Sequence, residues 1–222
     1  VSAKEEYDLI EKFDDQGLVA IDNFKFSTQL PAFNQNLKPK VAIFREQGVN
    51  GQNEMAAAFI LAGFEASDIH MQDVLDNPSL LEEFQGLAAC GGFSYGDVLG
   101  AGGGWSSSIR YNNGVRDAFE NFFNRDETFT FGVCNGCQML SNIKDLIPGA
   151  ENWPEFLWNE SDQFEARLSQ VTIAQSKSVL LDGMEGWQIP VAVAHGEGRA
   201  SFAENALKLS LIHISEPTRQ SP

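Results

Sequence analysis

The feature that most constrains this chain is a cysteine placed between a short strand and a helix. Residues 129–133 alternate in the two-residue period of a strand. The residues that follow recur at helical spacing and end in a Pro-Gly pair: Met139, Ile143, Leu146, Pro148 and Gly149. Cys134 therefore lies at the junction, with Gly132 and Gly136 on either side. Such a turn projects a side chain out of the fold and needs small neighbours, so the pattern predicts a nucleophile elbow.

The chemistry expected of Cys134 follows from its position at a helix N-terminus. The partial positive charge there favours the thiolate, which is the nucleophilic form of the side chain. Three other interpretations remain: an inert buried cysteine, a redox pair with Cys137 in a C-x-x-C, and a zinc ligand. The zinc interpretation is weak, because only Cys90 and three scattered histidines could complete a ligand set.

Composition limits the class of protein. The 222 residues carry 15 basic and 31 acidic side chains, a net charge of −16, and no basic cluster, which argues against nucleic-acid binding. No apolar run approaches the length of a membrane span, so we expect no membrane association. Three cysteines do not make a disulfide framework, and a reducing, cytoplasmic location fits them better.

Strand patterns alternate with helix patterns along much of the chain. Strands are predicted at 41–44, 66–71, 87–90 and 129–133, with a helix that Asn50 could cap and a helix around Val115–Phe123. Two more strands are expected at 171–174 and 191–194. This order predicts an α/β fold with an open, mostly parallel sheet and helices on both faces.

A glycine-rich loop is the second signal of function. Half of residues 91–104 are glycine, and the loop follows a predicted strand, at the sheet edge where ligands bind in open α/β folds. Together with the elbow, its backbone N–H groups could stabilise an oxyanion. A base is also needed, and His195 follows a strand to the same edge, whereas His70 is interpreted as structural and His213 lies in an atypical tail.

These motifs resemble those of the class I (triad) glutamine amidotransferases. Three longer segments, at 44–50, 90–102 and 194–199, narrow the resemblance to the C-terminal glutaminase domains of the large single-chain phosphoribosylformylglycinamidine synthases. The resemblance covers about Lys40 to Lys208, and it implies a flavodoxin-like sheet. We therefore divide the chain into a linker or the tail of a synthetase domain (1–39), a glutamine amidotransferase domain truncated at its C-terminus (40–208) and a non-native tail (209–222).

The resemblance also implies roles for individual residues. Cys134 would attack the carboxamide of glutamine and form a thioester, releasing ammonia for ATP-dependent amidine formation in purine synthesis. Backbone N–H groups of Gly92, Phe93 and Asn135 would form the oxyanion hole. Glutamine would be bound by four residues: Gly91, Gln138, His195 and Glu197. No cofactor or metal is expected in this chain, because ATP and magnesium belong to the synthetase domain, the expected partner on the same polypeptide.

The sequence departs from this family in one respect. The family's catalytic His-x-Glu lies in a Pro-His-Pro-Glu segment, which the chain does not contain, and His195-Gly196-Glu197 matches a different family motif. The chain as written is therefore expected to be a poor glutaminase. Two alternatives stay open: a stand-alone cysteine hydrolase that uses His195 as its base, and a non-catalytic docking domain.

Overall fold

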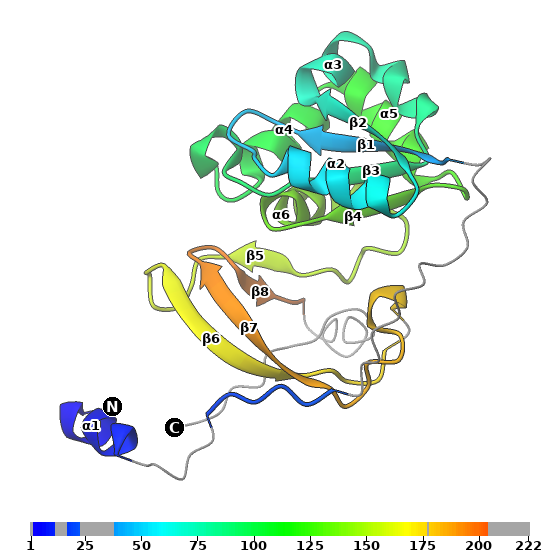
Figure 1. Ribbon diagram of the computed structural model, residues 1–222. Helices are drawn as coiled ribbons and strands as arrows, with labels where there is room; N and C mark the ends of the chain where they lie inside the picture. The colour runs from blue at the N-terminus through cyan, green and yellow to red at the C-terminus, as the bar shows by residue number, and fades with distance from the viewer. Residues whose placement is uncertain (1, 12–16, 23–37, 177, 204–222) are drawn as a thin grey trace.

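The computed structural model describes residues 2–11, 17–22, 38–176 and 178–203. Its larger unit is a parallel sheet flanked by helices, and two small antiparallel sheets lie beside that unit (Figure 1). The predicted α/β class, with an open parallel sheet and helices on both faces, is confirmed. The predicted tail at 209–222, with His213, lies outside the described residues.

The central sheet has the strand order β2-β1-β3-β4, and every pair is parallel. Its strands are β1 (Lys40–Arg45), β2 (Glu65–His70), β3 (Gly86–Ala89) and β4 (Phe129–Gly132). All four residues of β3 are buried, as are four successive residues of β1. Strands covered on both faces consist of consecutive apolar residues, so apolar and polar residues do not alternate in β1 and β3.

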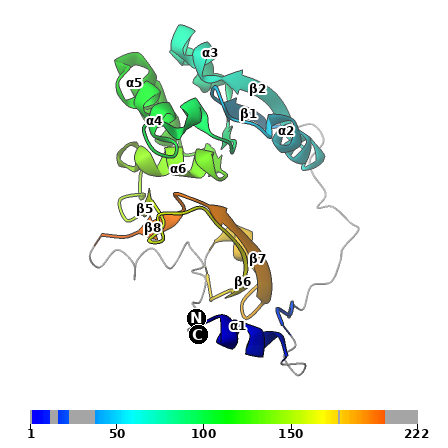
Figure 2. The same cartoon turned by 90° about the vertical axis from the view of Figure 1, so that its left-hand side faces the viewer.

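Helices cover both faces of the sheet. Ala42, Phe44 and Leu87 point into a core with four helices of one face: α3 (Met71–Asp76), α4 (Gly103–Arg110), α5 (Asn113–Phe123) and α6 (Asn135–Asn142). Val41 and Ile43 point into a smaller core on the other face, with α2 (Gln52–Leu61). Figure 2 shows α2 on one side of the strands and α4, α5 and α6 on the other.

The two small sheets are antiparallel ribbons. One pairs β5 (Glu155–Leu157) with β8 (Arg199–Ser201), and the other pairs β6 (Glu165–Thr172) with β7 (Gln188–His195). Short 3₁₀ turns connect other elements, at Pro78–Glu83, Ser94–Asp97, Lys144–Leu146 and Val179–Leu181. Near the N-terminus, α1 spans Ala3–Ile10, and Ile21 forms an isolated antiparallel bridge with Gln188 of β7. No described helix is long and apolar enough to cross a membrane.

Two local expectations differ from the structure. Asn50 does not cap α2: its N-cap is Gly51 in a left-handed conformation, and the Asn50 N–H donates to the Gly91 carbonyl. Helix α4 was not predicted, because glycine and serine are poor helix formers and fill most of it. Burial of Trp105 and Ile109 supplies the packing that these residues' propensities do not.

The strand order fixes where ligands should bind. The chain leaves β1 toward α2 on one face, and leaves the neighbouring β3 toward α4 and α5 on the other. In open α/β sheets the loops after such a pair of strands open a crevice at their carboxyl ends. Residues 46–50 and 90–102 are these two loops, and the loop after β4 carries Cys134.

Candidate active site

The strand-to-helix junction at Cys134 is present as predicted. β4 ends at Gly132, α6 begins at Asn135, and Cys134 is the N-cap residue between them. Its backbone has φ 53° and ψ −115°. Positive φ is uncommon for a residue with a side chain and is concentrated at functional sites. The cysteine side chain is exposed, so the fold presents this sulfur at the carboxyl edge of the sheet.

Three glycines make room for the junction. A Cβ on Gly91 would lie 3.1 Å from the Cβ of Cys134 and 3.7 Å from its Sγ. A Cβ on Gly132 would lie 2.7 Å from Leu140 Cδ1, and one on Gly136 would lie 2.6 Å from the carbonyl carbon of Ala89. The elbow is therefore closely packed against β3 and α6, most tightly at Gly136, where an added Cβ would overlap the backbone of Ala89.

The three cysteines differ in environment. Cys90 is 1% exposed, and burial raises the pKa of its thiol to about 11. Burial also raises the pKa of Cys137, and the neighbouring Cys134 adds to this effect. All three are free thiols. Among the described residues, no group of three or more His, Cys, Asp and Glu side chains is arranged to hold a metal ion.

This difference predicts selective alkylation. At pH 8 a thiol with a pKa of about 11, such as that of Cys90, is roughly 0.1% thiolate, and that fraction rises about tenfold for each pH unit below the pKa. Iodoacetamide should therefore modify exposed Cys134 at least about 10-fold faster than Cys90 or Cys137 in the folded protein. Peptide mass mapping over time measures this, with urea-unfolded protein as the control in which all three react alike. Equal rates in the folded protein would contradict the burial seen here.

The Gly91–Phe93 segment, predicted to supply the oxyanion hole, lies beside Cys134 and pairs with the loop after β1. Val49 and Gly92 form an isolated antiparallel bridge, the Asn50 N–H donates to the Gly91 carbonyl, and the Phe93 N–H donates to Gly48 O at 2.9 Å. Gly92 has φ 139°, which residues with a side chain rarely adopt. In this conformation the Phe93 N–H is thus directed at Gly48.

Asn135 joins the glycine-rich loop to the elbow helix through its side chain. It is 1% exposed, its Oδ1 accepts a hydrogen bond from the Ser94 N–H at 3.2 Å, and its Nδ2 donates to Asp97 Oδ1 at 2.9 Å. The sequence had pointed only to the backbone of Asn135. The amide side chain and its partner Asp97 are additional site residues, because they fix the loop against the helix that begins at the cysteine.

The loop after β7 reaches the same region. Glu197 Oε2 accepts a hydrogen bond from the Ala101 N–H at 2.8 Å, and Gln138 Nε2 donates to the Glu197 carbonyl at 2.9 Å. His195 Nδ1 accepts from the Gly198 N–H at 3.1 Å. No hydrogen bond or ion pair among the described residues joins His195 to Cys134. The structure therefore brings Gln138 and Glu197 together at the glycine-rich loop and gives the His195 ring a partner within its own loop.

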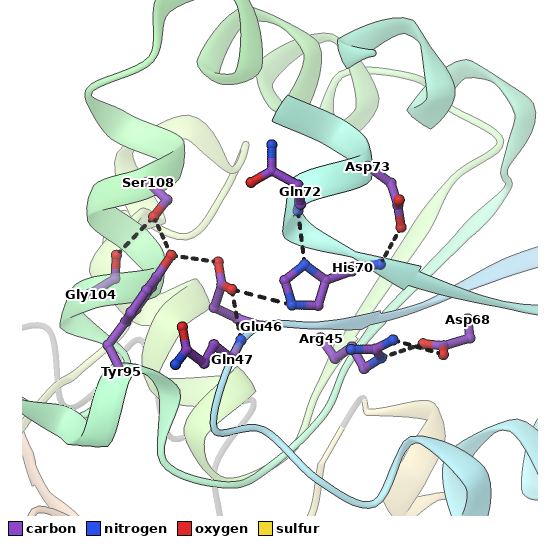
Figure 3. Close-up of polar contacts among 10 residues, drawn as sticks. All are labelled: Arg45, Glu46, Gln47, Asp68, His70, Gln72, Asp73, Tyr95, Gly104 and Ser108. Atoms are coloured by element: carbon purple, nitrogen blue, oxygen red, sulfur yellow. Dashed lines mark hydrogen bonds and ion pairs between the residues drawn. The ribbon is translucent and has the colours of Figure 1, made fainter. Parts of the chain in front are cut away.

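A second polar cluster lies at the end of β1 and was not identified from the sequence. Glu46 is buried there, next to His70 and Tyr95 (Figure 3). In the sequence, residues 44–50 contributed only to the family resemblance. The spacing of Glu46, His70 and Tyr95 along the chain does not indicate that they lie together in the fold.

Comparison with known proteins agrees with this geometry. Residues 38–213 match the model of the CobB/CobQ-like glutamine amidotransferase domain. The fold is similar to that in the structure of PurLQS from Thermotoga maritima, with a TM-score of 0.55 and 24% identity over 76% of this chain and 72% of that one. The family match spans most of the chain and includes the elbow, both loops and the 195–198 segment, so the chain belongs to the CobB/CobQ-like glutamine amidotransferase family.

Proposed function

We propose that this chain is the glutaminase part of a phosphoribosylformylglycinamidine synthase, which hydrolyses glutamine and supplies ammonia for amidine formation in purine synthesis. The observation that carries the proposal is the exposed sulfur of Cys134, held in a strained elbow beside the Gly91–Phe93 segment. Family membership supports glutamine as the substrate. The long sequence motifs and the likeness of the fold to PurLQS support the choice of synthase.

In the proposed reaction the Cys134 thiolate attacks the side-chain carbonyl carbon of glutamine. The new C–S bond pushes the carbonyl π electrons onto oxygen, giving a tetrahedral oxyanion. The C–N bond then breaks, the nitrogen takes up a proton and leaves as ammonia, and a γ-glutamyl thioester remains. Water attacks the thioester, which yields glutamate and restores the thiol.

Backbone N–H groups would stabilise the oxyanion. Removing one such donor from an acyl-transfer enzyme costs about 10²–10³ in rate, so their placement matters. Of the three predicted donors, the Phe93 N–H already donates to Gly48 O, and the proposal therefore rests on the N–H groups of Gly92 and Asn135. Asn135 is the first residue of α6, where N–H groups lack partners within the helix.

Gly91, Gln138, His195 and Glu197 are proposed to line the glutamine pocket. Gln138 and Glu197 lie together against the glycine-rich loop, which supports the proposal that both form one wall of the glutamine pocket. The Nδ1 of His195 is occupied by the Gly198 N–H, and this favours a pocket role over that of a base acting on Cys134. The proton transfers are thus assigned to a group other than His195.

Ammonia would be consumed by a synthetase domain that binds ATP and magnesium, which we place outside this chain. Three free thiols suit the reducing conditions of the cytoplasm, the location that we propose.

The proposal is tested by labelling with a diazoketone analogue of glutamine. We expect one label per chain, mapped to Cys134, and we expect millimolar glutamine to slow its attachment at least about 10-fold, whereas asparagine should not. Intact-mass measurement followed by peptide mapping gives both numbers.

Other outcomes point to the rival functions. Labelling of Cys134 that glutamine does not slow would favour a cysteine hydrolase with another substrate. Absence of labelling in folded protein would favour a docking role. A Cys134–Cys137 disulfide formed under mild oxidation, with no labelling of the reduced protein, would favour redox chemistry.

A further inference from the structure

Glu46 is a buried carboxylate that the proposed reaction does not use. It follows β1 directly and is 4% exposed. Glutamate is almost never buried to this extent unless it is paired or hydrogen-bonded, because transferring its charge out of water is costly. Glu46 lies at the carboxyl edge of the sheet, one residue past β1, so its buried carboxylate must have hydrogen-bonding or charged partners.

Three neighbours satisfy this carboxylate (Figure 3). Oε1 accepts a hydrogen bond from the Gln47 N–H at 2.7 Å and lies 3.5 Å from His70 Nε2, and Oε2 accepts from the Tyr95 hydroxyl at 2.9 Å. His70 Nδ1 accepts from the Gln72 N–H at 3.0 Å, so the ring proton of the neutral histidine is on Nε2, which faces Glu46. All of these contacts point toward Glu46 and none of them involves Cys134.

Tyr95 holds a conformation that its own residue type disfavours. It has φ 53° and is followed by Gly96 with φ 63°. The side chain is fixed on several sides: the hydroxyl donates to Glu46, Ser108 Oγ lies 3.3 Å from it, and a Cβ on Gly104 would lie 2.6 Å from the ring. Tyr95 is 40% exposed, but partial burial raises the pKa of its hydroxyl and the Glu46 carboxylate adds to that effect, so the hydroxyl remains a donor. Glu46 thus stabilises a left-handed turn in the glycine-rich loop.

The left-handed turn at Tyr95 and the 46–50 loop together hold the Gly91–Phe93 segment, which lies beside Cys134. The Tyr95 N–H donates to Gln47 O at 3.0 Å, and the Phe93 N–H donates to Gly48 O. At the other end, the Asn50 N–H donates to Gly91 O at 2.9 Å. The 46–50 loop therefore holds residues 91–95 at three points, and Glu46 joins the two segments through its hydrogen bonds to Gln47 and Tyr95.

We propose that Glu46 is a positioning residue for glutamine hydrolysis, which acts through Tyr95 to set the Gly91–Phe93 segment relative to Cys134. This role rests on the proposed function of Cys134. Misplacing a group by about 1 Å can cost on the order of 10²-fold in rate, so a contact outside the pocket can matter this much. Glu46 itself supplies no proton and makes no contact with substrate, whereas the segment that it positions would donate the Gly92 N–H to the oxyanion, so the effect should be on the transition state.

Two conservative variants test the role. Glu46→Gln keeps the size and an acceptor oxygen but removes the charge, and Tyr95→Phe removes only the hydroxyl. Asp68→Asn is the matched control, because Asp68 is an exposed carboxylate on β2 whose hydrogen bonds and ion pair go to Arg45 and not to Tyr95 or the Gly91–Phe93 segment. Each variant is labelled with the diazoketone analogue of glutamine and, in parallel, with iodoacetamide, which does not need the glutamine pocket.

We expect directed labelling to fall about 10-fold in Glu46→Gln and in Tyr95→Phe, with iodoacetamide rates unchanged within about twofold. Hydrogen exchange of peptide 91–97 should become faster in both variants and should not change in Asp68→Asn. Because Glu46 acts through Tyr95, the double variant should label no more slowly than Glu46→Gln alone. A merely stabilising role would lower the unfolding temperature without changing the ratio of the two labelling rates.

The measurements distinguish a wrong proposed function from a wrong positioning role for Glu46. If the unaltered chain is not labelled by the diazoketone, the proposed function is wrong and the positioning role with it. If the unaltered chain is labelled but Tyr95→Phe matches it in both the rate ratio and hydrogen exchange, only the positioning role is overturned. Tyr95→Phe decides this even if Glu46→Gln does not fold.

Discussion

Replacing Cys134 with serine should abolish covalent labelling by a glutamine analogue, from one label per chain to none. Serine nearly preserves size and can occupy the same N-cap position, but its hydroxyl is not ionised at neutral pH, whereas a thiolate is the attacking species. Removing the nucleophile of an acyl-transfer site typically lowers turnover by about 10³–10⁶-fold. Glutamate release should therefore fall to the level of a blank, whatever rate the unaltered chain shows.

The matched control is Cys137→Ser. Cys137 lies in the same helix turn, but burial raises its pKa, and the nucleophile interpretation gives it no part in the reaction. This variant should keep the label on the remaining elbow cysteine. If Cys137→Ser loses labelling as completely as Cys134→Ser, the two sulfurs act as a pair and the redox interpretation is favoured. If Cys134→Ser still takes up one glutamine-protected label, the nucleophile is elsewhere.

Replacing Gly136 with alanine should strongly destabilise the domain at the elbow. The added methyl would lie 2.6 Å from the Ala89 carbonyl carbon and 2.8 Å from its Cβ, and neither the end of β3 nor the start of α6 can retreat without breaking its packing. Overpacking of this kind costs about 3 kcal/mol. In a domain of this size that corresponds to a fall of roughly 6–12 °C in the unfolding temperature.

Gly114→Ala separates this effect from the general cost of replacing glycine. Gly114 lies in α5, and a Cβ there would meet its nearest atoms at 3.7 Å, an ordinary van der Waals distance. Alanine is a better helix former than glycine, so this variant should be neutral or stabilised by up to about 1 kcal/mol. Differential scanning calorimetry of both variants makes the comparison, and equal unfolding temperatures would show that the elbow is less tightly packed than described here.

Local patterns were sufficient where a residue's role depends on its neighbours in sequence. The strand before Cys134, the helix after it and the small residues around it are all consecutive, so the elbow could be predicted. The buried strands β1 and β3 were visible as short apolar runs for the same reason. β6 and β7 were each expected as strands, but their pairing in a separate antiparallel ribbon required contacts over a long stretch of chain.

By itself, the sequence determined the α/β order of elements, the elbow and the family. Only the tertiary structure decided that α4 forms despite its glycines and serines, that Gly51 and not Asn50 caps α2, and that the Phe93 N–H is directed at Gly48. It also placed Glu46 against Tyr95, 49 residues away. The physical reason is that propensity and periodicity act over a few residues, whereas burial and hydrogen-bond satisfaction depend on which distant segments the fold brings together.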